Sequence, residues 1–163
     1  MKFVSGPVTI GIDPGLGGAI AFLPADGWEP WVEDMPTFAY GKSGFVKRAV
    51  DPLAIARMLE PYGMAGTGRA FLERVSAFPG QGVGSMFSLG MSYWGVAAVV
   101  SALRIPLHLV EPREWKAHFR LNKDKELARA LASRYYPSVD LSRKKDHGRA
   151  EALLIARYGQ EKK

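Results

Sequence analysis

Short runs of apolar residues, separated by turn residues, dominate the first third of the chain. The runs at 8–13, 18–23 and 30–35 predict three strands, and the glycine and proline residues between them predict tight turns. Residues 36–50 combine Pro36, two glycines and three cationic side chains, so we expect an exposed loop there.

Strand patterns alternate with helical patterns in the rest of the chain. Two more strands are predicted at 69–73 and 106–110. Helices are predicted at 51–60, 85–103, 111–119, 123–135 and 147–158, the first with Asp51 as N-cap and ending before Pro61. This order predicts one α/β domain over residues 1–163, with a sheet that begins as an antiparallel meander.

The composition is that of an ordinary globular protein, with 47% hydrophobic and 23% charged residues among 163. The N-terminal residues lack the apolar core of a signal peptide, and we expect no stretch that spans a bilayer. The absence of cysteine excludes disulfides and thiolate metal sites. We expect a cytoplasmic protein that does not bind a membrane.

The net charge of +6 is distributed unevenly. Residues 1–112 are nearly neutral, whereas residues 113–163 carry fourteen Lys or Arg and seven Asp or Glu. A basic segment of this kind is either a solvated helical surface or a face that binds a polyanion such as nucleic acid. We favour nucleic acid.

Two predicted strands end on a carboxylate that is followed by a Gly- and Pro-rich loop. Asp13 ends the first strand and Glu73 ends the fourth. If these strands are neighbours, both side chains lie at one edge of the sheet. The alternative for Asp13 is a turn residue bonded to nearby backbone N–H groups, and for Glu73 an ion pair with Arg69 or Arg74.

The start of the last helix adds further candidates. His147 and Glu151 are four residues apart and share a helix face, and Asp146 stands at the helix boundary. Asp146 could instead be an N-cap, and His147 an ordinary partner of Glu151. Several acids from separate elements suit Mg²⁺, and two such ions about 4 Å apart can hydrolyse a phosphodiester.

These residues resemble a known family. The segments Gly11–Ala19, Leu72-Glu73 and Asp146–Ala156, in this order, resemble the RuvC family of Holliday-junction resolvases. Residues 79–82 and the pattern Val110-x-Pro112-x-x-Trp115-Lys116 are similar to the branch found in phages and their relatives.

The resemblance implies a ribonuclease H-like fold, in which a five-stranded mixed sheet has helices on both faces. It also implies a homodimer that cuts a four-way DNA junction by paired symmetric nicks with Mg²⁺ or Mn²⁺. Asp13, Glu73 and Glu151 match the family's acids, and the predicted metal ligands are these three with Asp146. Gly148 stands where many relatives have another acid, so either Asp146 or His147 is expected to complete the site, His147 as a ligand or water-orienting base.

The resemblance also assigns DNA contacts and a dimer interface. Phe78 is a candidate wedge in the junction, and the helix at 85–103 is the expected interface between subunits. The remaining candidates for contact with DNA are Gln81, Lys116, Arg120, Lys123, Lys125, Arg143, Lys144, Lys145 and Arg149.

Three other functions are compatible with parts of this pattern. A different ribonuclease H-like nuclease, acting on flaps, branched DNA or RNA–DNA hybrids, would use the same acids. An actin-type ATP site needs two lobes, for which 163 residues are too few. The third is a DNA-binding protein without catalytic activity. A dinucleotide-binding site is excluded, because a strand and not a helix is predicted after Gly15-x-Gly17.

Overall fold

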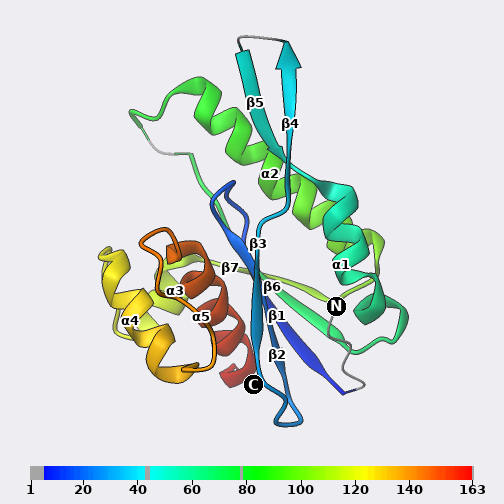
Figure 1. Cartoon of the computed structure of the whole chain (residues 1–163), viewed down its shortest axis with the longest axis vertical. Helices are drawn as coiled ribbons and strands as arrows, with labels where there is room; N and C mark the ends of the chain where they lie inside the picture. Colours follow the sequence, from blue (N-terminus) through cyan, green and yellow to red (C-terminus); the bar gives the residue numbers. More distant parts are fainter. Residues whose placement is uncertain (1–5, 43–44, 78, 163) are drawn as a thin grey trace.

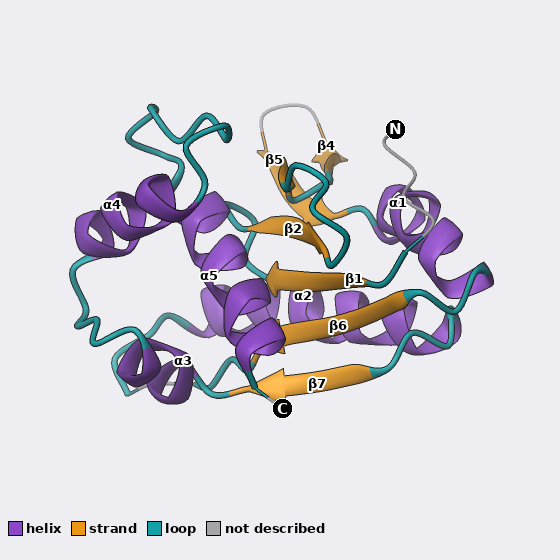
Figure 2. Cartoon of the chain, turned by 90° about the horizontal axis from the view of Figure 1, so that it is seen from below, coloured by secondary structure: helices purple, strands orange, loops and turns teal. Residues whose placement is uncertain are grey.

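The computed structural model describes residues 6–42, 45–77 and 79–162. Its central layer is a five-stranded sheet with the order β3-β2-β1-β6-β7 (Figure 1). The strands are β1 (Val8–Asp13), β2 (Ala19–Pro24), β3 (Trp31–Asp34), β6 (Gly68–Glu73) and β7 (Leu107–Val110). β1, β6 and β7 run parallel, and β2 lies antiparallel between β1 and β3 (Figure 2). The prediction of a mixed five-stranded sheet is confirmed.

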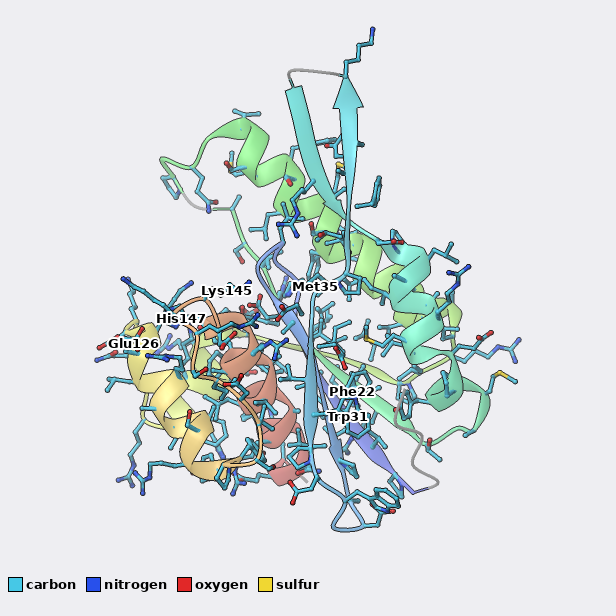
Figure 3. All side chains as sticks on the ribbon, viewed as in Figure 1. Phe22, Trp31, Met35, Glu126, Lys145 and His147 are labelled. Carbon is cyan, nitrogen blue, oxygen red and sulfur yellow. The ribbon has the colours of Figure 1, made fainter. Side chains whose placement is uncertain are left out.

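Helices cover both faces of the sheet, as predicted. The elements α1 (Pro52–Met64) and α2 (Val83–Ala102) lie on one face, and α3 (Pro112–His118), α4 (Lys125–Tyr135) and α5 (His147–Glu161) lie on the other (Figure 1). Alternate residues of β2 and β6 therefore point into two separate apolar cores. In the core beneath α1 and α2, Phe22 and Trp31 stack with ring centroids 4.9 Å apart (Figure 3).

The backbones of β1 and α5 are in direct contact. A Cβ atom at Gly11 would stand 2.1 Å from the carbonyl oxygen of Ala152 and 2.4 Å from the nitrogen of Ala156. A Cβ atom at Gly148 would stand 2.3 Å from the carbonyl oxygen of Gly17. Glycine at these positions therefore lets α5 lie directly on β1 and on the turn that follows it.

Side chains also fasten both ends of α5 to the sheet. Near its start, Arg149 forms an ion pair with Asp34 at the end of β3. Near its end, Arg69 of β6 donates to the carbonyl oxygen of Gly159 at 2.9 Å, and Gln160 donates to that of Leu23 at 3.0 Å. These contacts fix how far along the sheet α5 lies.

The expectation of a loop at residues 36–50 is wrong. β4 (Thr37–Lys42) and β5 (Phe45–Val50) pair antiparallel as a two-stranded sheet that projects from the body (Figure 1). Phe38 and Tyr40 favour strand structure, but the glycines and cations of this segment are more typical of a loop. Because the hairpin lies outside the main sheet, it lacks the buried run by which the other strands were found.

Two helices differ from their predictions. α1 continues through Pro61 to Met64. Proline has no N–H to donate to the carbonyl oxygen of Arg57, four residues earlier, and the helix tolerates this because Arg57 is exposed.

By length and composition α2 could also cross a membrane, with a mean hydropathy of 1.4, so the expectation that no stretch is apolar enough is wrong. The helix has 20 residues and no charged side chain, but the core helix of a soluble protein passes the same test.

Replacing Gly11 by alanine tests the contact between β1 and α5. We expect Gly11→Ala to lower the free energy of unfolding by at least about 3 kcal/mol, because both atoms that the methyl group would strike belong to the backbone. The measurement is urea denaturation followed by circular dichroism. Gly95→Ala is the matched control: a Cβ there meets nothing within 4 Å, so we expect no loss of stability. Equal stability of the two variants would contradict the contact.

Candidate functional site

Four carboxylates line one cavity of about 740 Å³, and one of them, Glu111, forms an ion pair with Arg74. The other three are Asp13, Glu73 and Glu151. Asp13 and Glu73 end the adjacent parallel strands β1 and β6, so both reach the same edge of the sheet. Glu151, one turn into α5, is brought to this edge by the contact between α5 and β1. The predicted convergence of Asp13, Glu73 and Glu151 is therefore present in the structure.

The carboxylates at the strand ends are hard to ionise. Burial, and secondarily the charge of Glu151, raises the pKa of Asp13 to about 6, although the N–H of Gly15 donates to it at 3.3 Å. Burial also raises the pKa of Glu73 to about 7, and the charges of Asp13 and Glu151 add to this increase. The acids repel one another, so the cavity favours a cation.

Lysine side chains supply positive charge in this cavity. Lys116 Nζ lies 3.2 Å from Glu151 Oε1, and Lys116 and Lys125 both lower the pKa of Asp13. Within residues 6–42, 45–77 and 79–162, no three Asp, Glu or His side chains are arranged to hold a metal ion as they stand. The oxygen donors nevertheless fit Mg²⁺, which prefers carboxylates and retains water, provided that their side chains rotate.

His147 also lines the cavity, from the first turn of α5. Its Nε2 lies 3.4 Å from Glu126 Oε1, and Figure 3 shows both residues on the side of α4 and α5. Its Nδ1 is buried and has no hydrogen-bond partner in the part of the chain that the structure describes. This nitrogen is unpaired but enclosed, so it would reach a ligand or a water molecule in the cavity by a turn of the ring.

Asp146 is not among the residues that line the cavity. Its buried carboxylate accepts hydrogen bonds from the backbone N–H and from Nε of Arg143, both at 2.8 Å. The side chain makes no N-cap hydrogen bond either, and its other ion-pair partner is Arg149, whose Nε lies 3.8 Å from Oδ1. Of the two candidates for completing the site, the geometry favours His147.

The expected DNA-binding residues fall into separate groups. Four of them line the cavity: Gln81, Lys116, Lys125 and Lys145. Three others are exposed and lie outside the cavity lining: Arg120, Lys123 and Lys144. Arg143 and Arg149 are held by Asp34 and Asp146, so in this structure they fasten α5. Phe78 lies outside the described residues.

Trp115 is the site residue that sequence reasoning missed. Its side chain is wholly buried, and its indole Nε1 donates to Glu73 Oε1 at 2.9 Å. A buried tryptophan needs an acceptor for its N–H. Glu73, at the end of β6, was the acceptor that the sequence could have suggested. The alternative partners for Glu73 are otherwise engaged, because Arg74 pairs with Glu111 and Arg69 bonds to α5.

Comparison with known proteins agrees with this architecture. No protein-family model matches the chain, and no curated protein does. A solved structure of Thermus thermophilus RuvC in complex with a Holliday junction substrate matches with a TM-score of 0.55 and 16% identity, over 92% of this chain and 90% of that one. The chain has the RuvC fold. A second Thermus thermophilus RuvC structure matches with a TM-score of 0.53 and 17% identity, over 91% and 90% of the two chains. The ribonuclease H-like fold expected from the sequence is thereby confirmed.

The raised pKa values make the stability of this RuvC-like domain depend on pH. In the absence of divalent metal, Asp13 and Glu73 hold protons in the native state that the unfolded chain has already released. We therefore expect the free energy of unfolding to fall by roughly 2–4 kcal/mol between pH 5 and pH 8. Urea denaturation in EDTA at several pH values measures this.

Neutral variants isolate the two carboxylates. Asp13→Asn with Glu73→Gln removes the titrating groups, so the loss at high pH should disappear and the variant should exceed the wild type in stability at pH 8. Glu60→Gln, which changes an exposed acid on α1, should retain the wild-type dependence. Parallel pH profiles for the double variant and the wild type would refute the assignment.

Proposed function

We propose that this chain is a metal-dependent, structure-selective DNA endonuclease that resolves four-way junctions by paired symmetric nicks. The observation that carries the proposal is the convergence of Asp13, Glu73 and Glu151 in one cavity, beside Lys116 and Lys125. Its setting in the RuvC fold supports the substrate class, since one solved RuvC holds a Holliday junction substrate.

In the proposed mechanism, Asp13, Glu73 and Glu151 hold Mg²⁺ or Mn²⁺, and His147 contributes its free nitrogen as a ligand or as the acceptor of a proton from water. Bound there, the metal supplies an activated water and neutralises charge on the leaving oxygen. Gly15, Gly17 and Gly18 line the same cavity and leave room for a phosphodiester.

The remaining cavity residues position the substrate in this proposal. Lys125 and Lys145 bind phosphates on either side of the scissile bond, and Lys116 exchanges Glu151 for a phosphate when metal is bound. Trp115 holds Glu73 in place through its indole N–H, so that the carboxylate faces the cavity. Exposed Arg120, Lys123 and Lys144 extend the basic surface beyond it.

Cleavage of labelled DNA tests the proposal. We expect paired symmetric nicks in a synthetic four-way junction with Mg²⁺ and none with EDTA. Asp13→Asn and Glu73→Gln should each reduce the rate by on the order of 1000-fold while junction binding is kept, because each removes a ligand and not a DNA contact. Glu60→Gln is the matched control and should cut at the wild-type rate.

Other substrates in the same assay separate the alternatives. Faster cleavage of a flap or an RNA–DNA hybrid would assign another ribonuclease H-like nuclease. Binding with no metal-dependent cleavage of any substrate would leave a DNA-binding protein.

Two single variants, His147→Ala and Asp146→Asn, test which residue completes the site. With cleavage rates compared at saturating metal, we expect the larger loss of rate for His147→Ala.

Paired nicks require two active sites, and we propose that α2 forms the interface of a homodimer. Phe87, Met91 and Trp94 lie at helical spacing on this helix and are 70%, 50% and 66% exposed. A polyanionic partner such as DNA gains little from this apolar stripe, whereas a second copy would bury it.

Disruption of the apolar stripe tests the dimer. We expect Trp94→Glu to convert a dimer into a monomer, because the new charge would be buried without a partner. Light scattering after gel filtration measures the mass. Leu53→Glu, on an apolar residue of α1 that is 59% exposed, is the control and should remain dimeric. A wild type that is monomeric at all concentrations, or a dimeric Trp94→Glu variant, would contradict this interface.

A further inference from the structure

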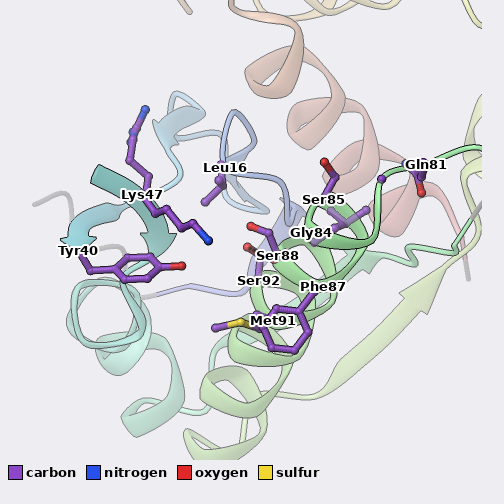
Figure 4. A pocket seen from close by; sticks show the side chains of 13 residues that line it. Leu16, Tyr40, Lys47, Gln81, Gly84, Ser85, Phe87, Ser88, Met91 and Ser92 are labelled. Atoms are coloured by element: carbon purple, nitrogen blue, oxygen red, sulfur yellow. Dashed lines mark hydrogen bonds between the residues drawn. The ribbon is translucent and has the colours of Figure 1, made fainter. Parts of the chain in front are cut away.

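A second hollow lies between the β4–β5 hairpin and the N-terminal half of α2 (Figure 4). Its volume is about 780 Å³, similar to that of the catalytic cavity. Tyr40, Lys47 and Arg48 line it from the hairpin, and Ser85, Ser88 and Met91 line it from the helix. We refer to it as the hairpin groove.

The hairpin groove adjoins the catalytic cavity. Gln81 and Leu89 line both of them. The hairpin itself projects beyond the end of α2 that carries this groove (Figure 1). A long ligand held in the catalytic cavity can therefore extend across the start of α2 onto the hairpin.

The chemistry of the groove suits a polyanion. From Thr37 to Val50 the sequence has three cations, Lys42, Lys47 and Arg48, and no acid. No acidic side chain is among the described residues that line the groove. The opposite wall presents the hydroxyl-bearing Ser85 and Ser88, which can donate to phosphate oxygens.

The register of the hairpin determines where its cations lie. Lys47 is paired with Tyr40 across the two strands, so their side chains share one face. Arg48 donates to Thr37 Oγ1 from Nε at 3.2 Å and from Nη2, which orients the guanidinium on the exposed hairpin. Strands of six residues span about 20 Å, enough to follow several phosphates.

We infer that the hairpin groove binds the phosphate backbone of the DNA arm that leaves the catalytic cavity, with Lys47 and Arg48 as its phosphate contacts. The inference rests on the proposed function and deepens it, because it assigns a second binding surface to the same substrate. The cations and hydroxyls of the groove match DNA, whereas Phe87 and Met91, which line its α2 side, continue into the apolar stripe proposed for the dimer interface.

Removal of both cations tests the inference. We expect Lys47→Ala with Arg48→Ala to weaken binding of a four-way junction, measured in EDTA at physiological salt, by about tenfold. The slope of log affinity against log salt should become shallower by about 2, because two phosphate contacts are lost. Cleavage at low junction concentration should fall by the same factor.

Two controls separate charge from folding. Arg57→Ala with Arg134→Ala removes the same number of exposed positive charges from α1 and α4, and should leave affinity and salt slope unchanged. Thr37→Val removes the acceptor of Arg48 but keeps both cations, so affinity for the junction should be retained. A loss of affinity equal to that of the Lys47/Arg48 variant would show that the shape of the hairpin matters and not its charge, and would overturn the inference.

The outcomes distinguish this inference from the proposed function. If the wild type binds and cuts junctions but the Lys47/Arg48 variant matches the Arg57/Arg134 control, the inference alone fails. If the Lys47/Arg48 variant becomes monomeric, the groove belongs to the interface between subunits and the inference is overturned. If the wild type binds no junction at all, both fail.

Discussion

The contact between β1 and α5 through Gly11 is the constraint on which the rest of the structure depends. Because no side chain separates the two backbones, α5 lies closer to the sheet than an ordinary helix can. Glu151 and His147 therefore reach the edge of the sheet where Asp13 ends β1. Ties to β2, β3 and β6 hold the helix at this position along the sheet. Backbone packing thus determines where the site lies, and the side chains placed there determine its chemistry.

The charges of the site come from two different layers. The acids belong to the sheet and to α5, which are joined by the closest packing in the fold. The nearest cations, Lys116 and Lys125, belong to α3 and α4, which make no strand contacts comparable to those of α5. The backbone positions of the acids are therefore set by β1, β6 and α5, whereas those of the cations depend on how α3 and α4 pack.

The sequence was sufficient for the sheet and for most of the acids, because both are local patterns. A buried strand is an apolar run, and Asp13 and Glu73 interrupt such runs at the point where glycines begin. The roles of Asp146 and His147 could not be separated, since they differ only in which way each side chain turns at the start of α5. The hairpin was missed because most of its described residues are exposed and its strands carry no apolar run. Trp115 was missed because its partner is distant in sequence and is set by how α3 packs below the sheet.

The hydrogen bond from Trp115 to Glu73 has an optical consequence. Trp28 and Trp94 are exposed and Trp31 is half-buried on Phe22, whereas Trp115 is wholly buried and touches an acid of the site. Its emission therefore carries the signal of that acid: loss of a proton, arrival of a cation or rotation of the carboxylate each changes the field at the indole. The chain contains an intrinsic fluorophore at the point where its chemistry is expected, so events there can be followed in real time without attaching a dye.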